Sequence, residues 1–319
     1  LSNDMDTSYY TKLALDQSSP FFNKATQQTT APGSTLKLLS TVTGMMEGLI
    51  DDGTYIECTG EFDLVTPSIW CWNKQGHGSL EIRGAIEQSC NYFFNMIGFQ
   101  AGKNSNGDFS ENLSLEKLQK YASEFHLDQK TGIEISEATP HVSDSKAVPS
   151  YIGQGNHLFT TSQLARYATA LATSGTVYDL SLLNKVTDSQ GKTLKEYDPA
   201  IENTMSDVPD NVWEDIHDGM RRVVETHEQF KGLGVTLSGK TGTAELDIYH
   251  PNHGLFIGYT TDEKSQPEYA IAVRIANGYS SGNACLTAND ILKYIYNLAD
   301  EDTILTGYAS SDTSNTSND

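Results

Sequence analysis

The sequence predicts an α/β protein of the α+β type, in which an antiparallel sheet packs with helices and a second lobe is all helical. Apolar residues recur at helical spacing from about residue 35 to about residue 230, and strand-like apolar runs follow from about 231 to 300. Successive strands without a helix between them favour antiparallel pairing. With 319 residues and a hydrophobic fraction of 37%, the chain is long enough to bury a full core.

The helical pattern is clearest in the segment that starts at Ser114, where an apolar stripe recurs every three to four residues. Thr160 and Gln163 predict a capping box at the start of another helix, and Gly175 marks the stop that follows it. The predicted helices cover 35–50, 80–99, 114–127, 160–174, 209–226 and 287–299.

The predicted strands of the main sheet cover 234–241, 254–260 and 268–276, and Lys240 is expected to end the first of them. Short strands near 182–187 and 192–196 suggest a hairpin, and the stretch 102–113 is expected to be a loop. One domain is expected over 1–306, with a helical lobe at 35–230 and the sheet region at 231–300. The polar tail, 307–319, is expected to be disordered.

The chain is strongly acidic, with 42 acidic against 21 basic residues and a net charge of −21. This balance argues against binding to nucleic acid or to anionic lipid. The sequence holds no apolar stretch of the length that a membrane span needs and no signal peptide. Any membrane anchor would therefore lie outside this sequence.

Three short motifs occur in a fixed order: Ser34-Thr35-Leu36-Lys37, Ser89-Cys90-Asn91 and Lys240-Thr241-Gly242-Thr243. Each motif alone is a weak signal, because such short patterns arise by chance in most chains of this length. Together and in this order they are a strong signal for serine acyl-enzyme chemistry.

Ser34 opens a predicted helix, where the free N–H groups and the helix dipole favour negative charge near its hydroxyl oxygen. Lys37 follows one turn later on the same face and is the expected base. An exposed lysine has a pKa near ~10.4, so burial and a neighbouring cation such as Lys240 are expected to lower it. Taken alone, the pattern would indicate an ordinary N-cap serine and a solvated lysine.

Ser89 offers a hydroxyl that can pass a proton between Lys37 and a leaving amine, in place of the histidine of other serine acyl enzymes. Asn91 offers an amide that can hold the acyl-side peptide group of a substrate. The alternative is a polar patch within a buried helix, whose members would need hydrogen-bond partners in any case.

In these three motifs and their order, the chain resembles the class B penicillin-binding transpeptidases, from about residue 8 to about 300. Further support comes from 152–155 and 253–259, while Cys71-Trp72 and His77-Gly78 are similar to the elongation-type subgroup, which implies a role in cell shape. The sequence departs from the family near 160–163, where a Thr-Pro pair is usual, and at Leu255, where a tryptophan is usual.

The family carries a membrane anchor, a non-catalytic pedestal and two sheet strands before its first motif. Only 33 residues precede Ser34 here, so we expect a catalytic domain that lacks its N-terminal part. The resemblance implies the penicillin-recognising serine transpeptidase fold.

Lys240 and the hydroxyls of Thr241 and Thr243 suit the terminal carboxylate of a peptide substrate. Gly242 would let a substrate backbone lie flat against the strand. The resemblance also implies an oxyanion hole formed by the backbone N–H groups of Ser34 and Thr243.

A second cluster of chemical groups comprises Cys58, Cys71, His77 and Cys90, with Cys285 outside it. Three thiols and an imidazole are a complete tetrahedral zinc set, and such a metal would tie the 58–78 loop to the helix of Ser89. A Cys58–Cys71 disulfide is an alternative suited to an exported protein, and free buried thiols are a third.

The combined signals predict a D,D-transpeptidase that cross-links peptidoglycan stem peptides through a Ser34 acyl-enzyme and is acylated by β-lactams. No cofactor is expected for catalysis. The family implies a membrane glycan polymerase as a partner, through the missing N-terminal part, and a location at the extracytoplasmic face of the bacterial membrane. His157 and His253 are expected to be structural.

Three alternatives remain open at this point. A D,D-carboxypeptidase differs only in using water as the acceptor, and a non-catalytic β-lactam-binding sensor or scaffold would keep the fold without turnover. A serine β-lactamase would need a deacylating Glu-x-x-Leu-Asn loop, which we do not find in this sequence.

Overall fold

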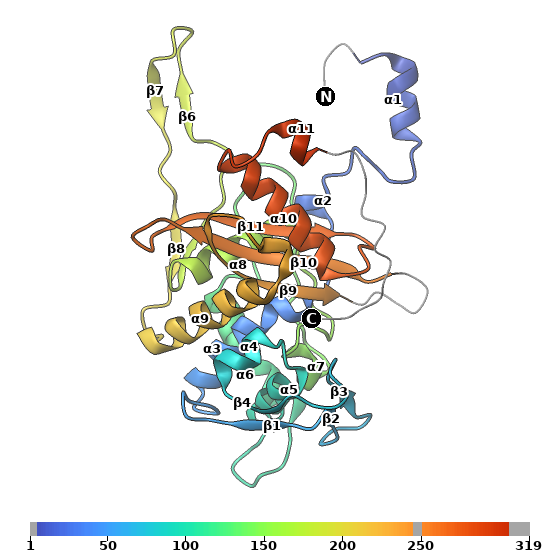
Figure 1. Cartoon of the computed structure of the whole chain (residues 1–319), viewed down its shortest axis with the longest axis vertical. Coiled ribbons are helices and arrows are strands. Elements are labelled where there is room, and N and C mark those ends of the chain that lie inside the picture. Colours follow the sequence, from blue (N-terminus) through green and yellow to red (C-terminus); the bar gives the residue numbers. More distant parts are fainter. Residues whose placement is uncertain (1–4, 245–250, 306–319) are drawn as a thin grey trace.

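The computed structural model describes residues 5–244 and 251–305, and the predicted tail at 307–319 lies outside these ranges. The central sheet has the strand order β11–β10–β9 and is antiparallel (Figure 1). Its strands are β9 (Thr236–Ala244), β10 (His253–Thr261) and β11 (Pro267–Ile275). The expectation that Lys240 ends the first strand is wrong, because β10 pairs with β9 as far as Ala244.

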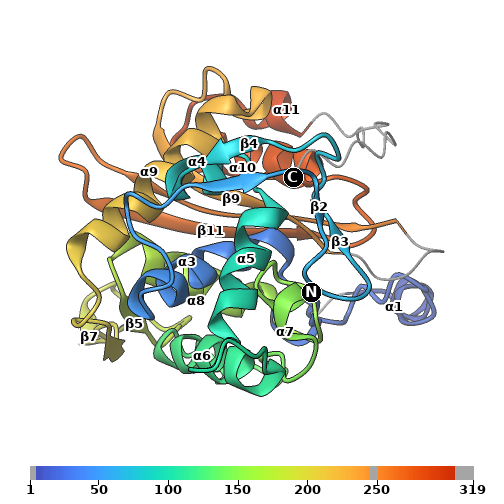
Figure 2. The same cartoon turned by 90° about the horizontal axis from the view of Figure 1, so that it is seen from below.

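Helices cover both faces of this sheet (Figure 2). Phe256 and Val273 pair across the sheet and join the apolar cluster of α10 (Ser281–Ile295). Leu255 and Ile257 alternate with Phe256, so they point to the other face and pack in the cluster that contains α8 (Thr161–Ala172). The predicted capping box at Thr160 is present at the start of α8. The helix α9 (Asp210–Thr226) packs against β9.

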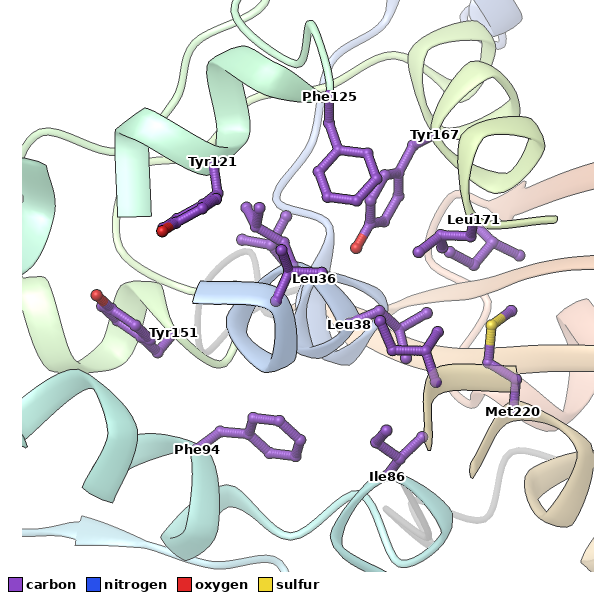
Figure 3. Packing of buried hydrophobic residues seen from close by; sticks show 14 of the residues in the cluster. Leu36, Leu38, Ile86, Phe94, Tyr121, Phe125, Tyr151, Tyr167, Leu171 and Met220 are labelled. Carbon is purple, nitrogen blue, oxygen red and sulfur yellow. The ribbon is translucent and has the colours of Figure 1, made fainter. Parts of the chain in front are cut away.

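The helical lobe surrounds the segment of the first motif, which forms a short 3₁₀ turn, η1 (Gly33–Leu36), followed by α3 (Lys37–Met46). Leu36 and Leu38 are fully buried at the centre of this lobe, among side chains of the surrounding helices (Figure 3). Burial of each leucine contributes about 2 kcal/mol. The remaining helices of the lobe are α4 (Ile82–Glu87), α5 (Asn91–Ala101), α6 (Glu111–Glu124) and α7 (Ala147–Ser150).

Two small sheets that were not predicted lie beside the Cys/His cluster, and Cys58 ends a strand of one of them. The strand β1 (Ile56–Cys58) pairs with β4 (Gly78–Leu80), and β2 (Glu61–Phe62) pairs with β3 (Ile69–Trp70). These strands have two or three residues each, which is too short for a clear alternation of apolar and polar residues. Long-range pairing therefore forms them.

The remaining elements lie around this body. The predicted hairpin is present as β6 (Lys185–Thr187) and β7 (Thr193–Glu196), and it extends away from the sheet (Figure 1). The other elements are α1 (Thr7–Ala14), α2 (Lys24–Gln27), β5 (Thr176–Tyr178), β8 (Ile201–Thr204), η2 (Glu228–Phe230) and α11 (Glu301–Ile304). In the described parts of the chain, no helix is both long and apolar enough to cross a membrane.

Candidate active site

Ser34 lies in the 3₁₀ turn η1 and is 8% exposed. We expected it at the start of an α-helix, but α3 begins only at Lys37, because the chain first turns sharply at Gly33 with a φ of +53°. Residues three apart align on one side of a 3₁₀ turn, so Ser34 and Lys37 still share a face. The backbone N–H of Gly33 donates to the carbonyl of Gly153 at 3.1 Å, which holds the turn against the segment that follows α7.

The amine of Lys37 is fully buried and reaches across to the second motif. Its Nζ donates to the carbonyl oxygen of Ser89 at 2.7 Å, to the Ser89 Oγ at 3.1 Å and to Asn91 Oδ1 at 2.7 Å. The Phe94 ring lies beside the same amine, with 5.7 Å between Nζ and the ring centroid. The structure thus brings the first two motifs into direct contact.

Ser89 occupies a left-handed backbone conformation, with a φ of +48°. Its N–H donates to the carbonyl of Ile86 at 3.1 Å, and the N–H of Cys90 donates to the carbonyl of Ala85 at 3.0 Å. This pair of bonds is the Schellman motif that ends α4, and glycine is the usual residue at the position of Ser89. A side chain there costs roughly 1 kcal/mol, and such strain gathers at functional sites.

The predicted continuous helix over 80–99 is therefore wrong. α4 ends at Glu87, and Cys90 is the N-cap of α5 rather than a residue within a helix. The helical spacing of apolar residues continues from α4 into α5, because both helices bury their apolar faces in the same core. Periodicity alone could not show the left-handed residue between them.

The third motif lies on β9, directly against the η1 turn that carries Ser34. A Cβ on Gly242 would lie 2.9 Å from the carbonyl oxygen of Pro32 and 2.9 Å from Thr35 Cγ2, and a Cβ on Gly33 would lie 2.4 Å from the carbonyl oxygen of Thr243. Both glycines are thus required for the close approach of η1 and β9. The missing side chain of Gly242 faces the η1 turn.

Lys240 shares the strand face of Gly242 by alternation and is fully buried, with its Nζ donating to the carbonyl of Thr241 at 3.3 Å. Thr241 pairs with Phe256 on the opposite face and is 1% exposed, whereas Thr243 is partly exposed. Thr243 therefore offers the more accessible of the two hydroxyls.

The backbone of Thr243 is oriented toward the η1 turn. Gln154 Nε2 donates to the carbonyl of Thr243 at 3.5 Å, so this carbonyl points away from β10. The N–H and C=O of one strand residue lie on the same edge, so the N–H of Thr243 also lies on the edge that faces η1.

The Cys/His cluster assembles as the sequence suggested. The Nδ1 atom of His77 lies 3.5 Å from Cys58 Sγ and 3.6 Å from Cys71 Sγ, and 4.0 Å separates the sulfurs of Cys71 and Cys90. All four ligand atoms lie within 4.8 Å of one another. The three cysteines are free thiols, so the structure contains no Cys58–Cys71 disulfide.

The contacts within the cluster favour the thiolate, which is the metal-binding form, at Cys58 and Cys71, and the protonated forms of Cys90 and His77. A hydrogen bond from Cys90 is the main influence that lowers the pKa of Cys71 to about 3 and the pKa of Cys58 to about 6. The same contacts raise the pKa of Cys90. Burial opposes charge on His77, but its bonds to Cys71 and Cys58 raise its pKa overall. Thiolates are the form of cysteine that binds metals.

The two histidines that we expected to be structural, His157 and His253, both have structural partners. His157 is 1% exposed, accepts the Ser143 N–H at its Nδ1 at 2.9 Å and contacts the carbonyl of Ser150 with its Nε2 at 3.2 Å. His253 accepts the N–H of Asn277 at 2.9 Å.

Sequence reasoning missed the contact of Trp72 with the turn of Ser89. The indole Nε1 donates to the carbonyl of Gln88 at 2.9 Å. The only sequence signal was the position of Trp72 between two residues of the Cys/His cluster.

The structure brings the three motifs together as a serine-bearing turn, a buried lysine–serine pair and a sheet-edge strand, an arrangement typical of penicillin-recognising proteins. The family described as the penicillin binding protein transpeptidase domain matches residues 2–297, and the chain belongs to this family. It is 25% identical over 321 residues to the peptidoglycan D,D-transpeptidase MrdA of Acinetobacter baumannii, a match of 89% of this chain with 45% of that protein. The chain spans about half the length of the curated relatives it matches.

Solved structures share the fold. The imipenem acyl-enzyme complex of penicillin-binding protein A from Mycobacterium tuberculosis superposes with a TM-score of 0.76 at 20% identity, over 92% of this chain and 65% of that chain. A structure described as showing coordination of polymerization and crosslinking by a peptidoglycan synthase complex gives a TM-score of 0.75 at 23% identity, over 95% of this chain and 51% of that chain. The predicted fold class and the resemblance to elongation-type class B proteins are confirmed.

Proposed function

We propose that this chain is the catalytic domain of a peptidoglycan D,D-transpeptidase, with Ser34 as nucleophile. The observation that carries the proposal is the contact of the buried Lys37 amine with Ser89 and Asn91. Lys37 lies on the same side of η1 as Ser34. This arrangement provides a base for the nucleophile and a second hydroxyl for the leaving group.

Acylation begins when Ser34 Oγ forms a bond to the penultimate D-Ala carbonyl carbon of a stem peptide. Two contacts of Lys37, both 2.7 Å, account for the two N–H bonds of a neutral amine, and its lone pair takes the Ser34 proton. Lys37 passes this proton to Ser89 Oγ, 3.1 Å away, as Ser89 delivers its own proton to the nitrogen of the terminal D-Ala and the C–N bond breaks. In the second stage, the amine of another stem attacks the ester carbonyl, and the proton that this amine loses returns through the same groups to Ser34 Oγ as the ester C–O bond breaks.

The free edge of β9 supports the substrate. The N–H groups of Ser34 and Thr243 stabilise the oxyanion of the tetrahedral intermediate, because both belong to segments in contact at Gly33. Lys240 and the partly exposed hydroxyl of Thr243 attract the terminal carboxylate, whereas Thr241 is only 1% exposed. Asn91 holds the acyl-side peptide group.

Two alternatives differ in the fate of the acyl-enzyme. A D,D-carboxypeptidase would transfer the acyl group to water, and the same site residues serve both reactions. A non-catalytic sensor would be expected to lack a charged or hydrogen-bonding group of the site, yet Ser34, Lys37, Ser89 and Lys240 are all present. We favour the transpeptidase because a matched relative has that name.

We also propose that the cluster of Cys58, Cys71, His77 and Cys90 binds one structural zinc ion. Zinc with bonds of about 2.3 Å to sulfur and about 2.0 Å to nitrogen keeps its ligand atoms about 3.5–3.8 Å apart in a tetrahedron. The separations of 3.5, 3.6 and 4.0 Å fit that geometry. Four protein ligands leave no position for substrate, so the ion would have a structural role.

The expected partners follow from the proposed reaction. Stem peptides and β-lactams would bind at Ser34, and peptidoglycan synthesis places the domain at the extracytoplasmic face of a bacterial membrane. A matched structure is described as coordinating polymerization with crosslinking, which supports a glycan polymerase as the partner of the longer protein.

Mass spectrometry after incubation with benzylpenicillin tests the proposal. We expect the mass of one penicilloyl group on the peptide that contains Ser34, and no adduct on Ser34→Ala. Ser79→Ala is a matched control, since Ser79 is exposed on β4. An adduct that persists on Ser34→Ala would contradict the assignment. We expect slow release of the adduct from a transpeptidase. Release within about a second, which a β-lactamase base would allow, would favour the β-lactamase alternative.

A further inference from the structure

Trp72 connects the Cys/His cluster with the turn that carries Ser89. Its ring lies edge-on to the His77 imidazole, with 4.9 Å between the centroids and an interplanar angle of 66°. On its other side, the indole Nε1 donates to the carbonyl of Gln88 at 2.9 Å. Gln88 is the C-cap of α4 and directly precedes Ser89.

The bond from Trp72 restrains the backbone of Ser89. The carbonyl of Gln88 and the N–H of Ser89 belong to one planar peptide group. Trp72 bonds one end of that plane, and the carbonyl of Ile86 bonds the other at 3.1 Å. The orientation of this plane sets φ of Ser89, which is +48°.

The next peptide plane is held in the same manner. Lys37 bonds the carbonyl of Ser89 at 2.7 Å, and the N–H of Cys90 bonds the carbonyl of Ala85 at 3.0 Å. Two side chains, Trp72 and Lys37, therefore complete a set of four bonds around a strained residue. Without such restraint, a non-glycine residue tends to leave the left-handed region.

We infer that Trp72 is a positioning residue for the proposed acyl transfer, acting through the Gln88 carbonyl to aim the Ser89 hydroxyl. The inference rests on the proposed function of Ser89 as a proton relay. It assigns the role to the indole N–H, whereas the aromatic ring packs against His77 of the Cys/His cluster. These two roles can be separated by substitution.

Trp72→Phe separates them, because phenylalanine keeps an aromatic ring beside His77 but cannot donate to Gln88. Stopped-flow acylation of the full chain by benzylpenicillin resolves the initial binding constant from the acylation rate constant. We expect the rate constant to fall about tenfold, as for a lost hydrogen bond at a catalytic group, with binding unchanged. Zinc content should match that of the wild type. Trp70→Phe is the control, because Trp70 is 49% exposed on β3.

A double-mutant cycle shows whether Trp72 acts through Ser89. Ser89→Ala should lower the acylation rate constant on its own, and Trp72→Phe should then cause no further loss. Hydrogen exchange of the peptide that covers residues 86–91 gives a readout independent of activity. This peptide should exchange faster in Trp72→Phe than in the wild type or in Trp70→Phe.

Equal acylation by the wild type and Trp72→Phe would overturn the inference and leave the proposed function intact. The inference would also be overturned if Trp72→Phe lowered the acylation rate constant as much in the Ser89→Ala background as in the wild type. It would be overturned too if the acylation rate constants of Trp72→Phe and His77→Ala simply followed their zinc contents. If Trp72→Phe is too unstable for the acylation assay, hydrogen exchange still tests the inference. It would be contradicted if the 86–91 peptide exchanged no faster, relative to the other peptides of the variant, than it does in the wild type. No adduct on wild-type Ser34 would overturn the proposed function, and the inference with it.

Discussion

The buried amine of Lys37 binds both oxygens of Ser89, the carbonyl at 2.7 Å and the hydroxyl at 3.1 Å, across a sequence separation of 52 residues. One side chain thus supports the strained backbone of Ser89 and contacts its reactive group. This double contact gives Lys37 a structural role beside the role as base that we propose for it.

Replacement of Lys37 by methionine should abolish the base while preserving much of the side-chain volume. We expect acylation by benzylpenicillin to slow by roughly 10²–10⁴-fold, the usual contribution of a general base. Fluorescent-penicillin labelling over time measures this rate. Lys103→Met is the control, because Lys103 also lies over an aromatic ring, that of Phe99, but at the surface. Similar rates for both variants would rule out Lys37 as the base.

Metal analysis of the purified chain should find about one zinc ion per molecule. His77→Ala and Cys90→Ser should lose the ion and slow acylation about tenfold, because the ligands also hold the segment next to Ser89. Cys285→Ser should retain the ion, since Cys285 is buried in α10, outside the cluster. Zinc-free wild-type protein with full acylation activity would contradict the prediction.

Gly33→Ala should damage the site through both backbone strain and a steric clash. The new Cβ would lie 2.4 Å from the carbonyl oxygen of Thr243 and would force η1 away from β9. We expect acylation to fall roughly tenfold or more, because small displacements of reacting groups are costly.

Gly48→Ala separates the two effects. Gly48 has a φ of +64° and open space where a Cβ would lie, so it carries the strain without the clash. Thermal unfolding should show destabilisation of both variants, by about 1 kcal/mol for Gly48→Ala, while only Gly33→Ala loses acylation. Equal acylation by the two variants would show that the approach of η1 to β9 is not required.

The stability of the fold should depend on pH through His157. Burial lowers the pKa of His157 from 6.5 to about 4, so the unfolded chain binds a proton at a higher pH than the folded chain does. The stability contributed by the neutral ring is complete above pH 6.5 and is lost as the pH falls toward 4, by up to about 3 kcal/mol.

His157→Gln removes this titration. The difference in the free energy of unfolding between wild type and variant should shrink, or reverse, from about pH 7.5 to about pH 4.5, as measured by chemical denaturation. His141→Gln is the control, because the His141 side chain is 40% exposed. Parallel pH dependence of wild type and His157→Gln would contradict the assignment.

Local patterns in the sequence predicted much of the fold. The strands around 254–260 and 268–276, the hairpin and the capping box at Thr160 were all predicted, because alternation and capping depend on neighbouring residues. The motif residues and the Cys/His cluster were also identified, since the chemistry of those residue types is readable without a fold.

Tertiary structure alone decided how these residues meet. The helix break at Ser89 exists because Lys37, Trp72 and the carbonyls at the end of α4 hold a left-handed residue in place. The small sheets beside the Cys/His cluster and the contact of Gly33 with Thr243 likewise join segments that are far apart in the chain. The sequence by itself determined which chemical groups are present and most of the local elements. Their geometry depends on long-range hydrogen bonds and close packing, which no local pattern encodes.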